Sequence, residues 1–225
     1  MEKTYIICHM MTSVDGHIDC AMTEHLPGVQ EYYETLDELN APSRVSGRVT
    51  AQLEMALPGE FKPKSPDKTS GGEAFSKAAE AEGYEIVMDT RGTLLWEDDP
   101  ASRRPLLIVT SEAVSREYLD YLDGNHISWI TCGKDRIDLK RACEILSGQF
   151  GVRRMAVVGG GHINAGFLEA GLLDEVSVLI GAGIDGRGGM AAVFDGLLEN
   201  RPVTPLKLTN VKQFSSGAVW LRYSV

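Results

Sequence analysis

Apolar and polar positions follow one another along the chain in a pattern that predicts strands alternating with helices. Short runs rich in Val, Ile, Leu and Met are mostly closed by a polar or glycine-containing turn, which is typical of buried strands. These runs lie at residues 4–11, 84–88, 93–96, 106–109, 127–131, 155–158 and 176–180. Segments with helical character lie at residues 31–40, 50–56, 115–122, 139–150 and 163–170.

The order of these segments predicts an α/β fold. Strands that alternate with helices form βαβ units, and such units build a largely parallel sheet. Two segments near the end of the sequence, 206–214 and 219–223, flank Ser215-Ser216-Gly217 and predict an antiparallel hairpin at the sheet edge. The 225 residues fit one α/β domain and show no linker, so we expect a single domain over residues 1–225.

Residues 58–72 interrupt this alternation. The segment holds three prolines, three glycines and three lysines, a composition that predicts a long surface loop. It is either a lid on the substrate side or an irregular insertion.

Composition and charge narrow the range of functions. A hydrophobic content of 43% and a charged content of 24% are ordinary for a globular protein. The net charge of −10 argues against non-specific binding of nucleic acid. No apolar run approaches the roughly 20 residues of a membrane-spanning helix, and residues 1–10 lack the pattern of a signal peptide. We therefore expect a cytoplasmic protein with neither a nucleic-acid nor a membrane partner.

The four cysteines do not suggest a metal site. Cys8, Cys20, Cys132 and Cys143 include no close C-x-x-C pair, and both a zinc site and a disulfide framework favour tighter clustering. We expect buried thiols and no metal.

The most informative segment is the glycine-rich turn at residues 157–164. An apolar strand runs into Gly159, Gly160 and Gly161, and a helix follows from His162 and Ile163. Consecutive glycines let the backbone approach a ligand closely, and the amides at a helix N-terminus favour phosphate. The spacing differs from G-x-G-x-x-G, and glycines in such a turn also serve purely structural roles. Both readings stay open.

Two shorter turns also follow strand ends, one after Ser46 and the other after Met11. Gly47 and Arg48 precede Thr50, which is placed to cap a helix. Arg48 either pairs with a ligand phosphate or is simply exposed after the turn. Earlier, Ser13, Asp15 and Gly16 close the first strand, where ligands gather in open α/β sheets. Asp-Gly is also a common turn pair.

Together, these segments resemble one family, the reductase domain of riboflavin biosynthesis, which shares its fold with dihydrofolate reductase. The matching motifs are Ser13-x-Asp15-Gly16, Gly47-Arg48-x-Thr50, Val109-Thr110-Ser111, Gly159-Gly160-Gly161-x-Ile163-Asn164, Gly171-Leu172-Leu173-Asp174-Glu175 and Asp185-Gly186-x-Gly188-Gly189. They occur in the family's order and spacing over nearly the whole chain. The resemblance implies a dihydrofolate-reductase-like, three-layer α/β fold and a homodimer.

The resemblance also implies a reaction and the residues that serve it. The family transfers a hydride from NADPH to C1′ of a ribosylamino-pyrimidine 5′-phosphate and opens the ribose to a ribityl chain. The residues implied at the cofactor are Gly47, Arg48, Thr50, Thr110, Ser111, Gly159, Gly160, Gly161, His162 and Ile163. Those implied at the substrate are Ser13, Asp15, Glu54 and Val158, with Asp15 as the catalytic residue near the reacting sugar. The proton for the sugar oxygen comes from Asp15 or from water.

The chain departs from the family in two respects. Val158 stands where the riboflavin reductases commonly carry a glutamate that faces the substrate, so a pterin or another heterocyclic imine is an alternative acceptor. The zinc deaminase signature of the bifunctional enzymes is also missing from this sequence, so only reductase activity is expected. A nucleotide-binding module without turnover is the alternative from another class.

Overall fold

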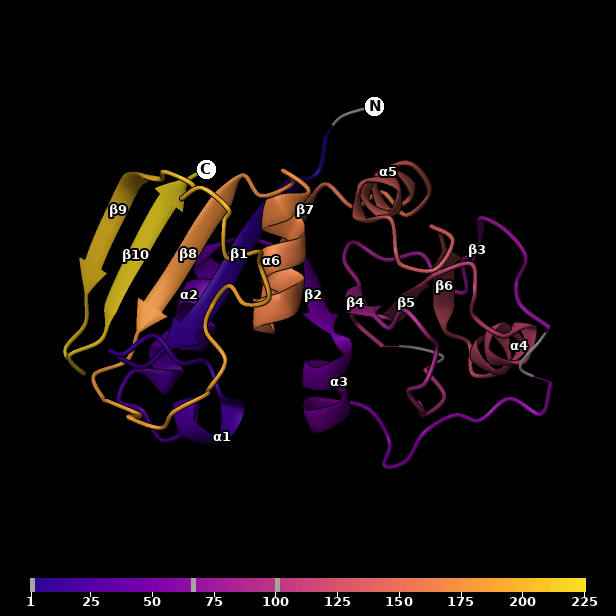
Figure 1. Ribbon diagram of the computed structural model, residues 1–225, viewed down its shortest axis with the longest axis horizontal. Coiled ribbons are helices and arrows are strands. Elements are labelled where there is room, and N and C mark those ends of the chain that lie inside the picture. Colours follow the sequence, from indigo (N-terminus) through magenta and orange to yellow (C-terminus); the bar gives the residue numbers. More distant parts are fainter. Residues whose placement is uncertain (1–2, 66–67, 100–101) are drawn as a thin grey trace. The chain divides into compact units, whose positions relative to one another are not determined.

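The computed structural model describes residues 3–65, 68–99 and 102–225, and the chain forms two compact units (Figure 1). Unit 1 takes the N-terminal residues up to Thr4 together with Pro42–Arg153. Unit 2 takes Tyr5–Ala41 together with Arg154–Val225. The expectation of a single domain over the whole chain stays a prediction. Among the helices that the structure describes, none is long and apolar enough to cross a membrane.

Unit 2 carries the first strand and the C-terminal hairpin. Its strands lie in the order β7–β1–β8–β10–β9. The parallel members are β7 (Arg154–Gly159), β1 (Tyr5–Thr12) and β8 (Glu175–Ile180). The antiparallel members are β10 (Val219–Ser224) and β9 (Lys207–Gln213), which form the predicted hairpin at the edge. The α/β class and the mostly parallel sheet with a C-terminal antiparallel hairpin are confirmed.

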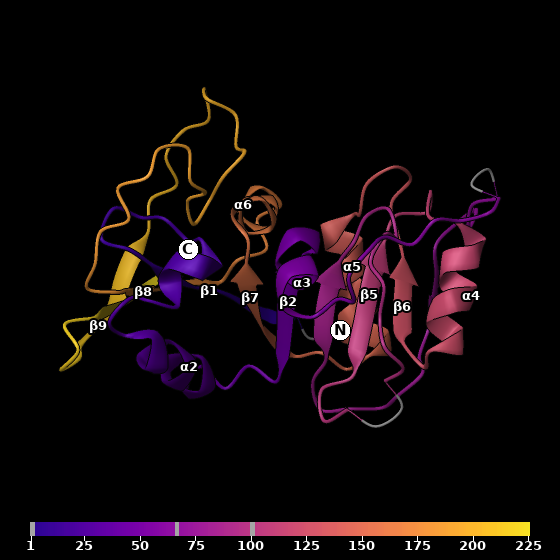
Figure 2. The ribbon, with the colours of Figure 1, turned by 90° about the horizontal axis from the view of Figure 1, so that it is seen from below.

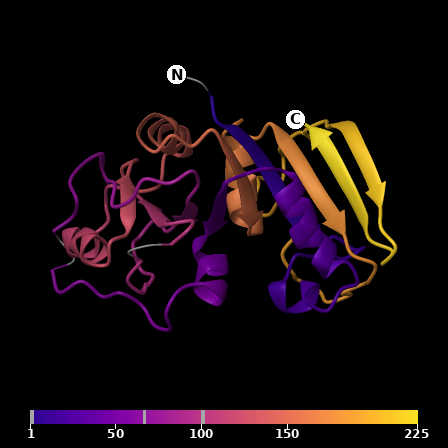
Figure 3. The ribbon, with the colours of Figure 1, turned by 180° about the vertical axis from the view of Figure 1, so that it is seen from behind.

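Helices cover both faces of the sheet in unit 2. Helix α2 (Val29–Glu38) lies on one face and α6 (Gly161–Glu169) on the other, as Figures 2 and 3 show from two sides. A short helix that the sequence pattern did not predict, α1 (Cys20–Thr23), follows β1. On the α2 face, alternate β1 residues Ile7 and Met11 pack with Leu179 and Trp220 in a buried cluster. The period-2 alternation of strand side chains therefore gives the three-layer arrangement.

A buried polar chain crosses the core of unit 2. The Trp220 indole Nε1 donates to the Ser177 hydroxyl oxygen at 2.7 Å, and that oxygen lies 2.9 Å from His9 Nδ1. His9 Nε2 lies 3.3 Å from the Thr35 hydroxyl oxygen. The Thr35 hydroxyl donates to the Tyr32 carbonyl oxygen at 2.9 Å, so it accepts from His9 Nε2. This assigns the His9 proton to Nε2, and Nδ1 accepts from the Ser177 hydroxyl. The order of donors is consistent along the whole chain of contacts.

Substituting Ser177 with alanine is expected to destabilise the fold. The change removes the group between Trp220 and His9, and a buried donor left without an acceptor costs about 1–3 kcal/mol. The free energy of unfolding, measured by denaturant titration, should fall by that amount. Ser215→Ala in the exposed hairpin turn is the matched control and should change it by less than about 0.5 kcal/mol. Equal stability of the two variants would contradict the network.

Unit 1 holds the second run of strands, in the order β3–β6–β5–β4–β2. The parallel members are β2 (Ser43–Gly47), β4 (Glu85–Met88), β5 (Leu106–Thr110) and β6 (Ser128–Thr131). Strand β3 (Ala74–Ser76), which the sequence pattern did not predict, pairs antiparallel with β6 at the edge. The helices are α3 (Arg48–Glu54), α4 (Arg116–Gly124) and α5 (Leu139–Gln149).

The core of unit 1 explains why a glycine stands at position 92. Tyr118 and Leu122 of α4 pack on Val87 and Ile108 of the sheet, within one buried cluster. Gly92 has φ +64, and a Cβ there would lie 2.4 Å from the Tyr118 ring. Only glycine fits this turn, since both the backbone conformation and the space exclude a side chain.

Three sequence expectations are corrected in unit 1. Residues 93–96 do not form a strand; Leu95 makes only an isolated bridge with Leu57, because the buried Asp89 carboxylate accepts from the Thr93 and Leu94 amides and holds the chain in a turn. Helix α3 begins at Arg48, two residues before the expected start, with Gly47 as N-cap. Thr50 therefore lies inside the helix and caps nothing.

The described part of the 58–72 loop is fastened to unit 1. The Glu117 carboxylate of α4 accepts from the backbone amides of Lys64, at 2.6 Å, and Ser65, at 3.0 Å. Further on, Ser70 donates through its amide to the Val114 carbonyl oxygen and through its hydroxyl to the Glu112 carbonyl oxygen. These bonds fit an irregular insertion packed on α4; residues 66–67 lie outside the described part of the chain.

Candidate active site

The turn after β1 is built around Ser13. Its amide donates to the His17 carbonyl oxygen at 3.0 Å, and its hydroxyl oxygen accepts from the His17 amide at 3.1 Å. Gly16 has φ +86, a conformation that favours glycine. Ser13 is buried and holds the turn that carries Asp15 and His17. Its role as a substrate-binding residue stays a prediction.

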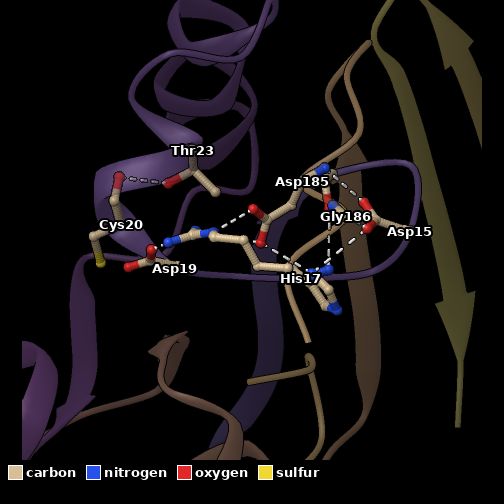
Figure 4. Close-up of polar contacts among 9 residues, drawn as sticks. Asp15, His17, Asp19, Cys20, Thr23, Asp185 and Gly186 are labelled. Carbon is tan, nitrogen blue, oxygen red and sulfur yellow. Dashed lines mark hydrogen bonds and ion pairs between the residues drawn. The ribbon is translucent and has the colours of Figure 1, made fainter. Parts of the chain in front are cut away.

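The Asp15 carboxylate clamps a second loop of unit 2. One oxygen accepts from the Asp185 amide at 3.0 Å and the other from the Gly186 amide at 2.8 Å. Hydrogen bonding from the Ser13 hydroxyl, and then from these two amides, holds the pKa of Asp15 well below its usual range. The carboxylate is therefore ionised, with both oxygens engaged (Figure 4). Its catalytic role stays a prediction.

His17 and Arg187 extend this clamp into a charged cluster. His17 Nδ1 lies 2.9 Å from Asp185 Oδ2 and 3.5 Å from Asp15 Oδ2. Arg187 bonds Asp185 through Nε and Asp19 through a terminal nitrogen at 2.7 Å. The Arg187 guanidinium, followed by the His17 ring, lowers the pKa of Asp185. Figure 4 shows Asp15, His17 and Asp19 of the segment after β1 close to Asp185 of the loop after β8.

The same loop continues to the start of α6. The Ile18 amide donates to the Ala191 carbonyl oxygen. The Asn164 side-chain amide, in the first turn of α6, donates to the Val193 carbonyl oxygen at 2.7 Å, and the Asp195 amide donates to the Gly161 carbonyl oxygen. Residues 183–196 therefore link the Asp15 turn with the glycine-rich turn.

The glycine-rich turn has the features that a phosphate needs. Gly159 ends β7 with φ +146, and Gly160 is the extended N-cap residue of α6. The Gly161 and His162 amides have no hydrogen-bond partner among the residues that the structure describes. Such amides at a helix N-terminus bind anions, so the pyrophosphate of a dinucleotide fits this turn.

Gly159, Gly160 and Gly161 are not glycines for the same reason. A Cβ on Gly161 would lie 2.5 Å from the Ala192 carbonyl oxygen, so Gly161 is required by packing within the chain. Gly159 is required by its positive φ. Gly160 has φ −100 and ψ −165, which any residue adopts, so its φ does not require a glycine.

The other predicted residues of unit 2 lie around this turn. His162 is exposed and Ile163 is half-buried on α6. Val158 is half-buried and packs against Leu36, Ala41 and Ala156. An apolar residue at position 158 is thus part of a small apolar cluster rather than a polar contact for a ligand.

Unit 1 holds the remaining predicted residues in two places. Around the start of α3, Arg48 is exposed and forms no ion pair among the described residues, Thr50 is half-buried, and Glu54 is exposed at the end of the helix. At the end of β5, Thr110 and Ser111 are buried. The Ser111 hydroxyl donates to the Thr90 carbonyl oxygen at 2.9 Å, so these hydroxyls hold the strand ends together.

The model of the RibD C-terminal domain matches residues 4–220 of this chain. The chain belongs to that family. The family contains the pyrimidine reductase of riboflavin biosynthesis, so the chain is a member of an oxidoreductase family. The resemblance read from the motifs is confirmed.

Solved structures share the fold of the RibD C-terminal domain family with this chain. A pyrimidine reductase-like protein from Corynebacterium diphtheriae has a TM-score of 0.71 at 17% identity, over 99% of this chain and 92% of that one. RibD from Acinetobacter baumannii has a TM-score of 0.68 at 17% identity, and this chain covers 58% of its length. Riboflavin biosynthesis reductase Rib7 from Saccharomyces cerevisiae has a TM-score of 0.62 at 15% identity, over 99% of this chain and 90% of that one. At these identities the likeness shows the fold alone.

The sequence pattern did not indicate His17 as part of the site, nor its contact with Asp185, which in turn pairs with Arg187. The histidines were too scattered to suggest a site, and Asp185 and Arg187 lie far from the Asp15 turn in sequence. The available signal was topological. Since β1 and β8 are parallel neighbours, the loops at their carboxyl ends lie side by side.

Proposed function

We propose that this chain is an NADPH-dependent reductase acting on a ribosylamino-pyrimidine 5′-phosphate. The observation that carries the proposal is the pair of unpartnered amides at Gly161 and His162, in a chain matched by a reductase family model over residues 4–220. A turn that fits a dinucleotide phosphate supports the nicotinamide cofactor in particular.

The chain's own residues bind and orient the cofactor. The glycine-rich turn takes the pyrophosphate on its amides, and Ile163 borders it. In unit 1, the exposed Arg48 beside Gly47 and Thr50 offers a cation for a phosphate, and Thr110 and Ser111 shape the end of β5. The bound cofactor supplies the hydride; the protein holds the acceptor carbon against it and excludes water.

The residue at position 158 is compatible with a different hydride acceptor. Val158 packs into an apolar cluster, so it gives a heterocycle an apolar surface without a carboxylate. This favours testing pterins and other cyclic imines beside the ribosylamino-pyrimidine phosphate. A binding module without turnover is the second candidate, favoured only by the engagement of both Asp15 oxygens within the chain.

A titration with NADPH and with NADH, followed by nicotinamide fluorescence, tests the proposal. Saturable binding that prefers NADPH, followed by oxidation of NADPH on adding a ribosylamino-pyrimidine phosphate, is the expected result. Oxidation only with pterins would move the substrate to the alternative class. Binding without turnover of either acceptor class would favour the module, and no binding of either nucleotide would remove the reductase proposal.

We also propose that the chain acts in the cytoplasm. The buried thiols support this compartment: burial raises the pKa of Cys132 and Cys143 to about 12, and no disulfide joins the four cysteines. Thiols persist in reducing compartments.

The homodimer is proposed through the apolar side of the hairpin. Leu208 and Val211 of β9 are exposed by 51% and 54%, and the register places them beside Tyr223 and Leu221. These four side chains carry no charge. Because each copy of the chain has a net charge of −10, two copies repel each other least where they meet through such an uncharged surface.

Val211→Lys is expected to convert the dimer to a monomer, because it buries a charge in each half of a symmetric interface. Light scattering coupled to size exclusion measures the mass. Asn210→Lys, on the opposite face of the same strand, is the control and should stay dimeric. A wild-type monomer would end the proposal.

A further inference from the structure

The proposed reduction needs a proton as well as a hydride. The identity of the proton donor, inferred here, rests on that proposed function. When the ribose opens, its ring oxygen leaves C1′ with an electron pair and must be protonated. Asp15 is a poor source, because hydrogen bonds hold the pKa of its carboxyl well below the usual range. Its oxygens are occupied by the Asp185 and Gly186 amides.

His17 is the titratable side chain beside Asp15, and one of its two ring nitrogens, Nε2, is available to a ligand. Its Nδ1 faces Asp185 Oδ2 at 2.9 Å, and no bond to its Nε2 exists among the described residues. The side chain is 20% exposed. In Figure 4 the His17 ring lies beside the Asp15 and Asp185 carboxylates. A carboxylate on Nδ1 fixes the tautomer and the ring orientation and leaves Nε2 to exchange protons.

Asp185 is suited to this orienting role. Its side chain is only 3% exposed, and Arg187 and the Asp15 clamp fix its position from two sides. The buried carboxylate therefore holds the His17 ring in one orientation through Nδ1.

The charges that face His17 come from two loops. Asp15 lies on its own loop and Asp185 on the loop after β8, both negative. The guanidinium of Arg187, from the second loop, pairs with Asp185 and Asp19. These two carboxylates offset its positive charge, so Arg187 repels a charged His17 ring only weakly.

We propose that His17 is the catalytic acid of the reduction. The hydride bonds to C1′, the bond from C1′ to the ring oxygen breaks, and the electron pair stays on that oxygen. The oxygen takes the proton from His17 Nε2, and the neutral imidazole regains a proton from water. Charge and atoms balance, with the nicotinamide cofactor oxidised and the sugar carbon reduced.

His17→Asn tests this role with little disturbance of the loop. The asparagine amide replaces the donor at Nδ1 and so keeps the bond to Asp185, but nothing replaces Nε2. We expect kcat to fall by about 100-fold or more, which is the usual effect of a general acid, with the Kd for NADPH and the KM unchanged. In the wild type, kcat should fall as the pH rises through the range in which histidine loses its proton, and this slope should vanish in the variant.

His126→Asn is the matched control. His126 also faces a carboxylate through Nδ1, Asp98 at 2.6 Å, but this pair is exposed on unit 1. The control should keep the wild-type kcat and its pH dependence. A second readout is independent of turnover: a long-range ¹H–¹⁵N spectrum should show the neutral His17 ring protonated at Nδ1.

The possible results separate this role from the proposed function. An active His17→Asn enzyme with the wild-type rate and pH profile would overturn the acid role and leave the reductase standing. A His17 ring protonated at Nε2 in its neutral form would overturn it as well. A wild type that binds NADPH but reduces no acceptor would overturn the reductase function, and the acid role with it.

Discussion

Replacing Gly160 with valine is expected to raise the Kd for NADPH by about tenfold or more. The amides of Gly161 and His162 lie next to this residue in the turn, and a β-branched side chain there blocks the approach of a pyrophosphate. The loss of one charge-assisted hydrogen bond, about 1.5–3 kcal/mol, already corresponds to at least tenfold. Nicotinamide fluorescence measures the change.

Position 160 is a sharper probe than its neighbours. Its φ of −100 is one that any residue adopts, whereas Gly159 has φ +146 and Gly161 has no room for a Cβ. Gly72→Val is the control, since nothing lies within 4 Å of a Cβ there. An unchanged Kd in a folded Gly160→Val protein would remove the glycine-rich turn from the cofactor site.

The fold was readable from the sequence where the pattern was strong. The buried parallel strands are continuous apolar runs. In the hairpin, a turn of Ser and Gly separates the two antiparallel strands, so the hydrophobic pattern and the turn residues indicate the same structure. The short β3 and α1 were missed because segments of three and four residues carry no period. Residues 93–96 misled because buried Leu94 and Trp96 look like a strand but are held in a turn by Asp89.

The site was only partly readable, for a physical reason. Motifs placed Asp15 and the glycines, because a tight turn and a helix start leave a signature in the residue types. The partners of Asp15 are backbone amides at Asp185 and Gly186, and an amide leaves no such mark. His17 gains its importance only from Asp185, 168 positions away in sequence, and that contact requires the parallel pairing of β1 with β8.

The change of Asp15 to asparagine is expected to lower kcat by about 100-fold while leaving the Kd for NADPH unchanged. Asparagine offers one acceptor oxygen in place of two, so the Asp185 or the Gly186 amide would face an NH₂ group. That mismatch costs about 1–3 kcal/mol and releases the loop that carries Asp185. The orienting group of His17 then shifts, and a displacement of about 1 Å is enough for a 100-fold loss of rate.

Asp19→Asn separates the clamp from the rest of the cluster. Among the described residues, the Asp19 carboxylate pairs with Arg187 and not with His17 or Asp185. Such an accessible ion pair contributes about 0–1 kcal/mol, so kcat should stay within about threefold of the wild type. A thermal melt of each variant distinguishes local release of the loop from unfolding. If Asp15→Asn kept the wild-type kcat, the clamp would be a structural turn alone. If Asp15→Asn lost NADPH binding in proportion to kcat, the released loop would disturb the glycine-rich turn rather than the proton donor. Residues 183–196 reach that turn through their contacts with Asn164 and Gly161.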